Sequence, residues 1–124
     1  SASNEIVILY PNGGETLAPS VENIIKWKTY GTVPTVNVDF AIIDNPSDAD
    51  WIEIASGEEN VDSLFWTPSM ESDSVRIRIR DPDSFNNETG KYKTEDISGW
   101  YFSVSSGRAA KITGVKAGSK GFNK

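Results

Sequence analysis

Ser74 to Asp81 reads Ser-Val-Arg-Ile-Arg-Ile-Arg-Asp, and this stretch decides the fold that the sequence predicts. Every second residue is apolar and the residues between are arginines, which is the period of two of an extended chain. The apolar set is Val75, Ile77 and Ile79, and the basic set is Arg76, Arg78 and Arg80. The pattern is typical of a strand half buried in an antiparallel sheet. A second layer must cover the apolar face, and the arginine face must meet water, acidic neighbours or a ligand.

Other short runs alternate in the same way or are rich in β-branched residues. They cover residues 5–10, 23–29, 35–43, 51–55, 63–67 and 100–104. Turn residues separate them at a spacing of roughly ten residues, and no amphipathic helix of useful length is present. We read residues 58–60 as a polar turn and residues 81–99 as a stretch without clear periodicity. The sequence therefore predicts an all-β protein with a two-sheet antiparallel β-sandwich.

The domain division follows from composition. Residues 1–104 form the predicted sandwich module. Residues 105–124 are rich in glycine, serine and lysine and lack acids, so we expect a basic tail or linker, with an added edge strand at 112–115 as the alternative. The chain of 124 residues is long enough for one domain with its own core.

Charge and composition exclude several function classes. The formal net charge of -6 argues against a nucleic-acid partner. No apolar run approaches the roughly 20 residues of a membrane span. The chain has no cysteine and no histidine, which removes thiolate metal sites and the commonest general base. No carboxylate stands in a distinctive context, so we do not expect an enzyme.

Several motifs in chain order carry a family resemblance. They are Tyr10-Pro11-Asn12-Gly13-Gly14-Glu15, Ile25-Lys26-Trp27, Trp51 with Ile54-Ala55, Phe65-Trp66-Thr67-Pro68, Arg76-Ile77-Arg78 and Phe102-Ser103-Val104. From about Ile6 to Val104 the chain resembles the immunoglobulin-like β-sandwich modules of secreted bacterial enzymes and surface proteins. It also resembles carbohydrate-binding module family 81, a small family that binds β-glucan. The resemblance implies an immunoglobulin-like fold and an accessory role, either as a spacer or as a carbohydrate-binding module attached to a glycoside hydrolase.

Two features depart from the plain spacer pattern. Residues 81–99 are longer and more acidic, and Gly99-Trp100-Tyr101 places two adjacent aromatics just before the last strand. Trp27 and Trp66 fall on the apolar side of the alternation in their strands, so both are expected in the core. Trp51, which follows an acidic loop, and Trp100, which follows a glycine, are instead expected at the rim of a sheet. There they would either stack on sugar rings or cap the ends of the core.

The arginine face has two readings as well. In an immunoglobulin-like order its strand lies beside the strand that carries Asn37 and Asp39. Arginine and aspartate would then form cross-strand pairs, or the same groups would form the polar base of a groove that holds sugar hydroxyls. The residues predicted to bind carbohydrate are Trp51, Trp100, Tyr101, Asn37, Asp39, Arg76 and Arg78.

Acidic loops suggest calcium. Asp81, Asp83, Asn86 and Glu88 are oxygen donors within one irregular segment, and residues 44–50 hold a second acidic group. Calcium takes six to eight such oxygens. The alternative is that these acids are solvated turn residues. Neither stretch has the spacing of an EF-hand loop.

These observations lead to one functional hypothesis with two alternatives. We expect a secreted, monomeric, non-catalytic module that binds β-glucan chains, of the cellulose or mixed-linked type, and targets an attached catalytic domain to them. The alternatives are a structural spacer and a protein-interaction module. Polysaccharide is the expected partner, calcium the expected cofactor if there is one, and neither nucleic acid nor a membrane is expected.

Overall fold

The computed structural model describes residues 4–42 and 51–106. The acidic residues 44–50 and the tail from residue 107 onward lie outside this range, so the predictions made for them are not addressed by the structure. None of the described segments forms a helix that is long and apolar enough to cross a membrane.

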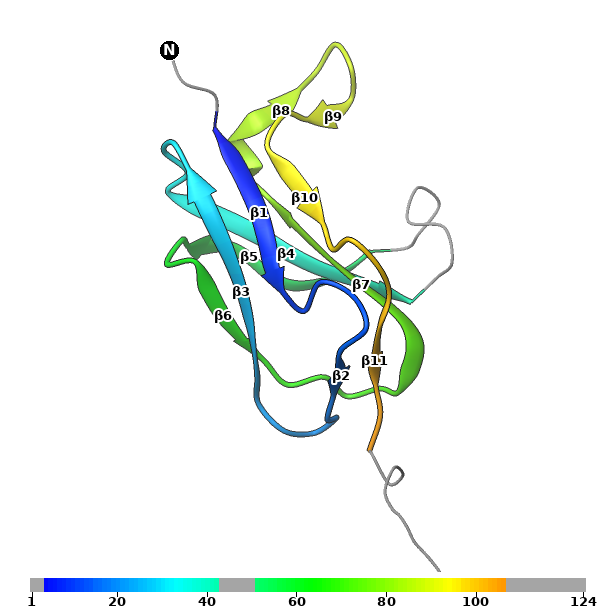
Figure 1. Cartoon of the computed structure of the whole chain (residues 1–124). Helices are drawn as coiled ribbons and strands as arrows, with labels where there is room; N and C mark the ends of the chain where they lie inside the picture. The colour runs from blue at the N-terminus through cyan, green and yellow to red at the C-terminus, as the bar shows by residue number, and fades with distance from the viewer. Residues whose placement is uncertain (1–3, 43–50, 107–124) are drawn as a thin grey trace, which may run out of the picture.

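The described residues form two main sheets that pack face to face, with a small hairpin at one end (Figure 1). The small sheet has the order β1 (Glu5–Tyr10), β3 (Asn23–Tyr30), β6 (Ser63–Trp66). The large sheet has the order β2 (Thr16–Leu17), β11 (Phe102–Val104), β7 (Ser72–Arg80), β4 (Thr35–Ile42), β5 (Ile52–Glu59), and β10 (Glu95–Ile97) also pairs with β7. The hairpin consists of β8 (Phe85–Asn86) and β9 (Lys91–Tyr92). The predicted all-β, immunoglobulin-like sandwich is confirmed.

The core lies between the sheets, where β7 supplies its apolar face. Val75, Ile77 and Ile79 are fully buried, as the alternation predicted. Trp27 and Trp66 are 2% and 7% exposed, so both are core residues. Each buried indole removes a large apolar area from water and stabilises the fold by about 2 to 3 kcal/mol.

Two polar side chains complete the contact between the sheets. The Trp27 indole N–H donates to the side-chain oxygen of Asn60 at 2.9 Å, so this buried donor is satisfied. A carboxylate oxygen of Asp96 on β10 accepts the backbone N–H of Ile8 on β1 at 2.7 Å. The register of β1 against β3 shifts between Ile8 and Tyr10, and this carboxylate supplies an acceptor at the start of that irregularity.

Three details of the strand prediction were wrong. β5 continues through Glu58 and Glu59, read from sequence as a turn, because an edge strand pairs through its backbone while its polar side chains stay in water. Residues 81–99 hold a short 3-10 turn at Pro82–Ser84, the β8–β9 hairpin and β10. The last strand starts at Phe102, so Trp100 and Tyr101 lie in the connection before it.

Candidate functional site

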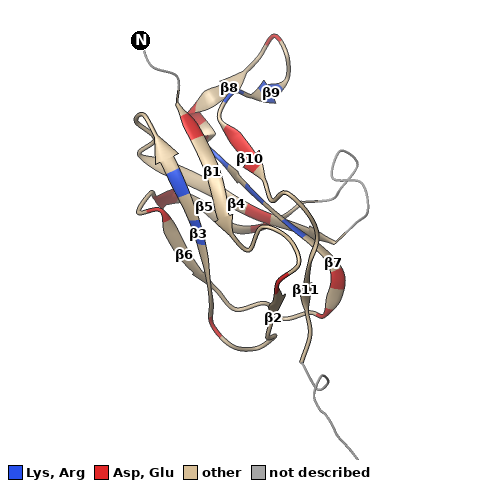
Figure 2. Cartoon of the chain, in the orientation of Figure 1, with Lys and Arg blue, Asp and Glu red and all other residues tan. Residues whose placement is uncertain are grey.

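The outward face of the large sheet pairs the arginines of β7 with the polar residues of β4. In the antiparallel register Arg80 lies opposite Asn37, Arg78 opposite Asp39, and Arg76 opposite Ala41. Directly paired residues share one face of a sheet, so these side chains project together away from the core. Figure 2 shows the basic positions spread along β7. The predicted neighbourhood of the two strands is confirmed.

The central pair is an ion pair with little access to water. Nε and Nη2 of Arg78 both donate to Oδ2 of Asp39, at 3.1 and 2.9 Å. The two side chains are 15% and 9% exposed. Arg80 approaches the same oxygen with its Nη2 at 3.8 Å. Asp39 is therefore occupied by protein donors, as the cross-strand reading of the sequence expected.

Aromatic rings cover each of these arginines. The guanidinium carbon of Arg78 lies 4.4 Å from the centroid of the Trp51 ring, and that of Arg80 lies 4.0 Å from the Tyr92 ring. Arg76 lies 4.7 Å from the ring of Tyr101 and 5.8 Å from that of Trp100. Such contacts contribute about 0.5 to 2 kcal/mol each, depending on burial. We call this surface the arginine–aromatic face and define it by Arg76, Arg78, Arg80, Trp51, Tyr92, Trp100 and Tyr101.

The three predicted aromatics differ in exposure. The side chain of Trp100 is 64% exposed, whereas Trp51 and Tyr101 are partly buried. Trp100 and Tyr101 meet edge to face, with ring centroids 5.2 Å apart and an interplanar angle of 68°. Trp100 thus presents most of an indole to solvent while its neighbour supports one side. An indole that is exposed and held in place is a surface on which a flat apolar ring can stack.

The Pro11–Glu15 turn holds Trp100 in position from below. Asn12 accepts the backbone N–H of Gly99 with its side-chain oxygen at 2.7 Å and that of Trp100 with its carbonyl at 3.1 Å. Gly14 donates its N–H to the carbonyl of Tyr101 at 2.9 Å. The aromatic pair is therefore tied by its backbone to a turn more than 80 residues earlier in the chain.

The glycine and the acid of this turn have separate roles. The Glu15 carboxylate accepts the N–H groups of Asn12 and Gly13, at 3.0 and 2.7 Å, and so fixes the turn. Gly13 has φ +141°, and a Cβ at this position would lie 2.8 Å from the Cβ of Trp100. Glycine is required because the turn passes directly beneath the tryptophan backbone. The motif that carried the family resemblance thus builds the aromatic platform.

Asn37 is engaged by its own sheet. Its side-chain oxygen accepts the N–H of Gly57 on β5 at 2.8 Å, where the register of β4 against β5 is irregular. Gly57 has φ +64°, which a glycine adopts without strain. Of the predicted polar residues, Asn37 therefore has its side-chain oxygen in use, Asp39 has Oδ2 in use, and Arg78 has Nε and Nη2 in use.

Arg76 differs from the other arginines. Its cross-strand neighbour is Ala41, which offers no acceptor, and within the described residues Arg76 forms no ion pair. The Nε atoms of Arg76 and Arg80 are buried and have no hydrogen-bond partner in the described part of the chain. A buried donor without an acceptor costs about 1 to 3 kcal/mol, and Arg76 and Arg80 each keep one such donor.

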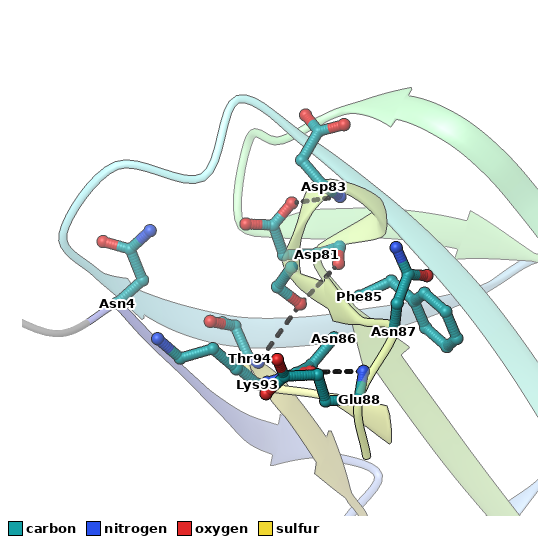
Figure 3. A pocket seen from close by; sticks show the side chains of 10 residues that line it. Asn4, Asp81, Asp83, Phe85, Asn86, Asn87, Glu88, Lys93 and Thr94 are labelled. Carbon is teal, nitrogen blue, oxygen red and sulfur yellow. Dashed lines mark hydrogen bonds between the residues drawn. The ribbon is translucent and has the colours of Figure 1, made fainter. Parts of the chain in front are cut away.

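The predicted calcium ligands lie elsewhere, around an open hollow of about 850 Å³ beside the β8–β9 hairpin (Figure 3). Oδ1 of Asp81 accepts the N–H of Asp83, and Oδ1 of Asn86 accepts the N–H of Glu88. In Figure 3 the carboxylates of Asp83 and Glu88 lie at opposite ends of the hollow. Among the described residues, no group of three or more acidic side chains is placed to hold a metal ion. Calcium binding stays a prediction that this placement does not favour.

Sequence reasoning missed the contribution of Tyr92 and of the Pro11–Glu15 turn. It placed Arg80 on the arginine face with Arg76 and Arg78 but left it out of the predicted binding residues. Tyr92 could not be predicted, because the hairpin that carries it gave no periodic signal. The Asn-Gly-Gly sequence indicated a turn, but nothing in it indicated contact with Trp100.

Comparisons with known proteins show a likeness of fold. No protein-family model matches this chain, and no curated protein matches it. The chain is similar to a crystal structure of the CARDB domain of a Pyrococcus furiosus protein in complex with di-metal ions. The similarity covers 83% of this chain and 86% of that one, with 21% sequence identity and a TM-score of 0.34. At this distance the likeness concerns the β-sandwich architecture alone.

Proposed function

We propose that this chain is a non-catalytic carbohydrate-binding module that holds a β-glucan chain, of the cellulose or mixed-linked type, on its arginine–aromatic face. The observation that carries the proposal is Trp100, whose indole is 64% exposed although its backbone is fixed at Asn12. A large apolar side chain that is ordered and uncovered is costly to leave in water, which favours a ligand that covers it. Sugar rings present flat C–H faces that suit such an indole, and each stacked ring would contribute about 1 to 3 kcal/mol by analogy with base stacking.

The rest of the face supplies direction and hydrogen bonds. Tyr101 and Trp51 lie on either side of β7, each in contact with an arginine of that strand. In this proposal a glucan chain crosses β7 and stacks first on Trp100, and Arg76 donates to its hydroxyl or ring oxygens. Asn37, Asp39 and Arg78 hold the neighbouring part of the sheet in shape through their mutual and backbone contacts.

The proposal assigns the chain an accessory role. Asp39 accepts two hydrogen bonds from Arg78, which gives this acid a role in holding the sheet. In a secreted bacterial protein the module would keep an attached glycoside hydrolase close to its polymer, which raises the effective substrate concentration without chemistry of its own.

A second candidate is a structural spacer or a protein-interaction module. It is favoured by the internal pairing of Asn37, Asp39 and Arg78, because a face that only stabilises a sheet would show the same contacts. The small sheet also carries exposed apolar side chains, including Leu9 at 54% and Phe65 at 62% exposure. In this reading Trp100 binds no carbohydrate.

Titration with soluble glucans separates the two functions. Tryptophan fluorescence is followed while cello-oligosaccharides or mixed-linked β-glucan are added to the wild type, Trp100→Ala and Phe65→Ala. Phe65 is a matched control, since its side chain is 62% exposed but lies on the small sheet. We expect Trp100→Ala to weaken binding about tenfold or more, equal to about 1.4 kcal/mol, and Phe65→Ala to leave it unchanged. No binding of any glucan by the wild type would contradict the proposal and support the spacer.

A further inference from the structure

The arginine–aromatic face has acidic cross-strand neighbours beside Arg78 and Arg80 but not beside Arg76. Asp39 lies opposite Arg78, Glu53 opposite Asp39, Glu95 opposite Arg80, and Ala41 opposite Arg76. Neutral sugar hydroxyls both donate and accept, so a site for a neutral chain usually offers both kinds of group. Here Oδ2 of Asp39 accepts from Arg78, and the side-chain oxygen of Asn37 accepts from the Gly57 N–H. The cation that has no acidic cross-strand neighbour is the Arg76 guanidinium, which is suited to an anion.

Arg76, in the middle of β7, is the arginine of this strand that has no polar cross-strand neighbour on β4. On β4 the cross-strand neighbour is Asn37 for Arg80, Asp39 for Arg78 and Ala41 for Arg76. Alanine has no side-chain acceptor, so Arg76 lacks one on this strand. Arg76 forms no ion pair within the described residues, and its Nε is buried without an acceptor. Arg80 also has a buried Nε without a partner, but its Nη2 lies 3.8 Å from the Asp39 carboxylate.

This uncompensated cation lies beside the exposed indole. The guanidinium of Arg76 is 5.8 Å from the Trp100 ring and 4.7 Å from the Tyr101 ring. A ring stacked on Trp100 would therefore bring its substituents close to Arg76. A carboxylate matches the planar fork of a guanidinium with two parallel hydrogen bonds, and such charge-assisted bonds are roughly twice as strong as neutral ones.

We propose that the sugar bound on Trp100 carries a carboxylate, as in a uronic acid residue, and that this carboxylate pairs with Arg76. This inference rests on the proposed carbohydrate-binding function of the same face. It specifies the charge of the ligand, because it holds that the module prefers an acidic β-linked chain to the neutral chain with the same backbone. The formal net charge of -6 repels a polyanion at long range, so the preference is local to the arginine and is weakened by salt.

The test compares two oligosaccharides that differ in the oxidation of C6. Calorimetric titrations use cellohexaose and a β-1,4-linked glucuronic acid hexamer against the intact chain at low and high salt. We expect the acidic hexamer to bind about tenfold tighter at low salt, equal to about 1.4 kcal/mol, and this advantage to shrink as salt is raised. Arg76→Gln should lower the affinity for the acidic hexamer more than the affinity for cellohexaose, so that the ratio of the two affinities falls to about one, while Arg76→Lys should retain part of the advantage.

Lys26→Gln is the matched control. Lys26 is exposed on β3 of the small sheet, so the same loss of one charge there should leave both affinities unchanged. If cellohexaose binds and the acidic hexamer binds no more tightly, this inference is wrong and the proposed function stands. The inference is also wrong if the acidic preference survives Arg76→Gln. If neither oligosaccharide binds, the proposed function itself is contradicted.

Discussion

Gly13 is the position where a single methyl group tests how the aromatic platform is built. In the structure, a Cβ on Gly13 would lie 2.8 Å from the Cβ of Trp100 and 3.3 Å from its backbone nitrogen. Carbon atoms in ordinary contact are about 3.5 to 4.0 Å apart, so Trp100 or the turn would have to move by about 0.7 Å or more. The turn also has φ +141° at this residue, which side-chain-bearing residues rarely adopt.

We therefore expect Gly13→Ala to lower the free energy of unfolding by about 2 to 6 kcal/mol, combining backbone strain of about 1 to 3 kcal/mol with overpacking of similar size. Gly14→Ala is the matched control. Gly14 has φ +83° in the same turn, but a Cβ there meets nothing within 4 Å. Its cost should be backbone strain alone, about 1 to 2 kcal/mol.

Urea denaturation followed by tryptophan fluorescence measures both variants. A double-mutant cycle with Trp100→Gly, which removes the facing Cβ, isolates the contact. The cost of Gly13→Ala should fall by about 1 to 2 kcal/mol in the Trp100→Gly background, and the cost of Gly14→Ala should not change. If Gly13→Ala is no more costly than Gly14→Ala, or if the cycle shows no coupling to Trp100, the account of the turn as a support for the platform is refuted.

Three further predictions concern the rest of the sandwich. Asp39→Ala leaves the partly buried Arg78 without its acceptor, so it should lower the free energy of unfolding by about 2 to 3 kcal/mol in urea denaturation. The control is Asp73→Ala: the Asp73 side chain is exposed, so the same measurement should change by less than about 0.5 kcal/mol. Asp96→Ala removes the acceptor of the Ile8 N–H between the sheets and should cost about 1 to 3 kcal/mol; a cost near zero would mean that water replaces the carboxylate. Calcium and a chelator should give the same melting temperature, because Asp81 and Asn86 each use a side-chain oxygen to accept a backbone N–H and no group of three acids among the described residues is placed to hold a metal ion; a rise of several degrees with calcium would contradict this.

The sheets were predictable because alternation carries direct information about which face is buried. Val75, Ile77 and Ile79 must be covered, and only a second layer can cover them. The pairing of Asp39 with Arg78 followed from the order of strands in an immunoglobulin-like sheet. The connection before Phe102 has no alternating pattern that would show which of its side chains are buried. The exposure of Trp100 was therefore inferred from the preceding glycine alone.

The parts that could not be predicted depend on contacts between distant segments. The support of Trp100 comes from Asn12 and Gly13, and no local signal links a turn near the start of the chain to a loop near residue 100. The hairpin that carries Tyr92 is made of two-residue strands, which are too short for alternation to be visible. The acids near the hollow looked like metal ligands because composition does not reveal that backbone N–H groups already occupy some of their oxygens.

The most direct test of the central claim is a nuclear magnetic resonance titration of the four tryptophan indole N–H signals with a soluble β-glucan oligosaccharide. The exposed Trp100 should shift most, Trp51 should shift less, and the buried Trp27 and Trp66 should stay in place. Unchanged signals for Trp100 at saturating glucan, or shifts confined to the buried pair, would contradict the account of this face as a polysaccharide-binding surface.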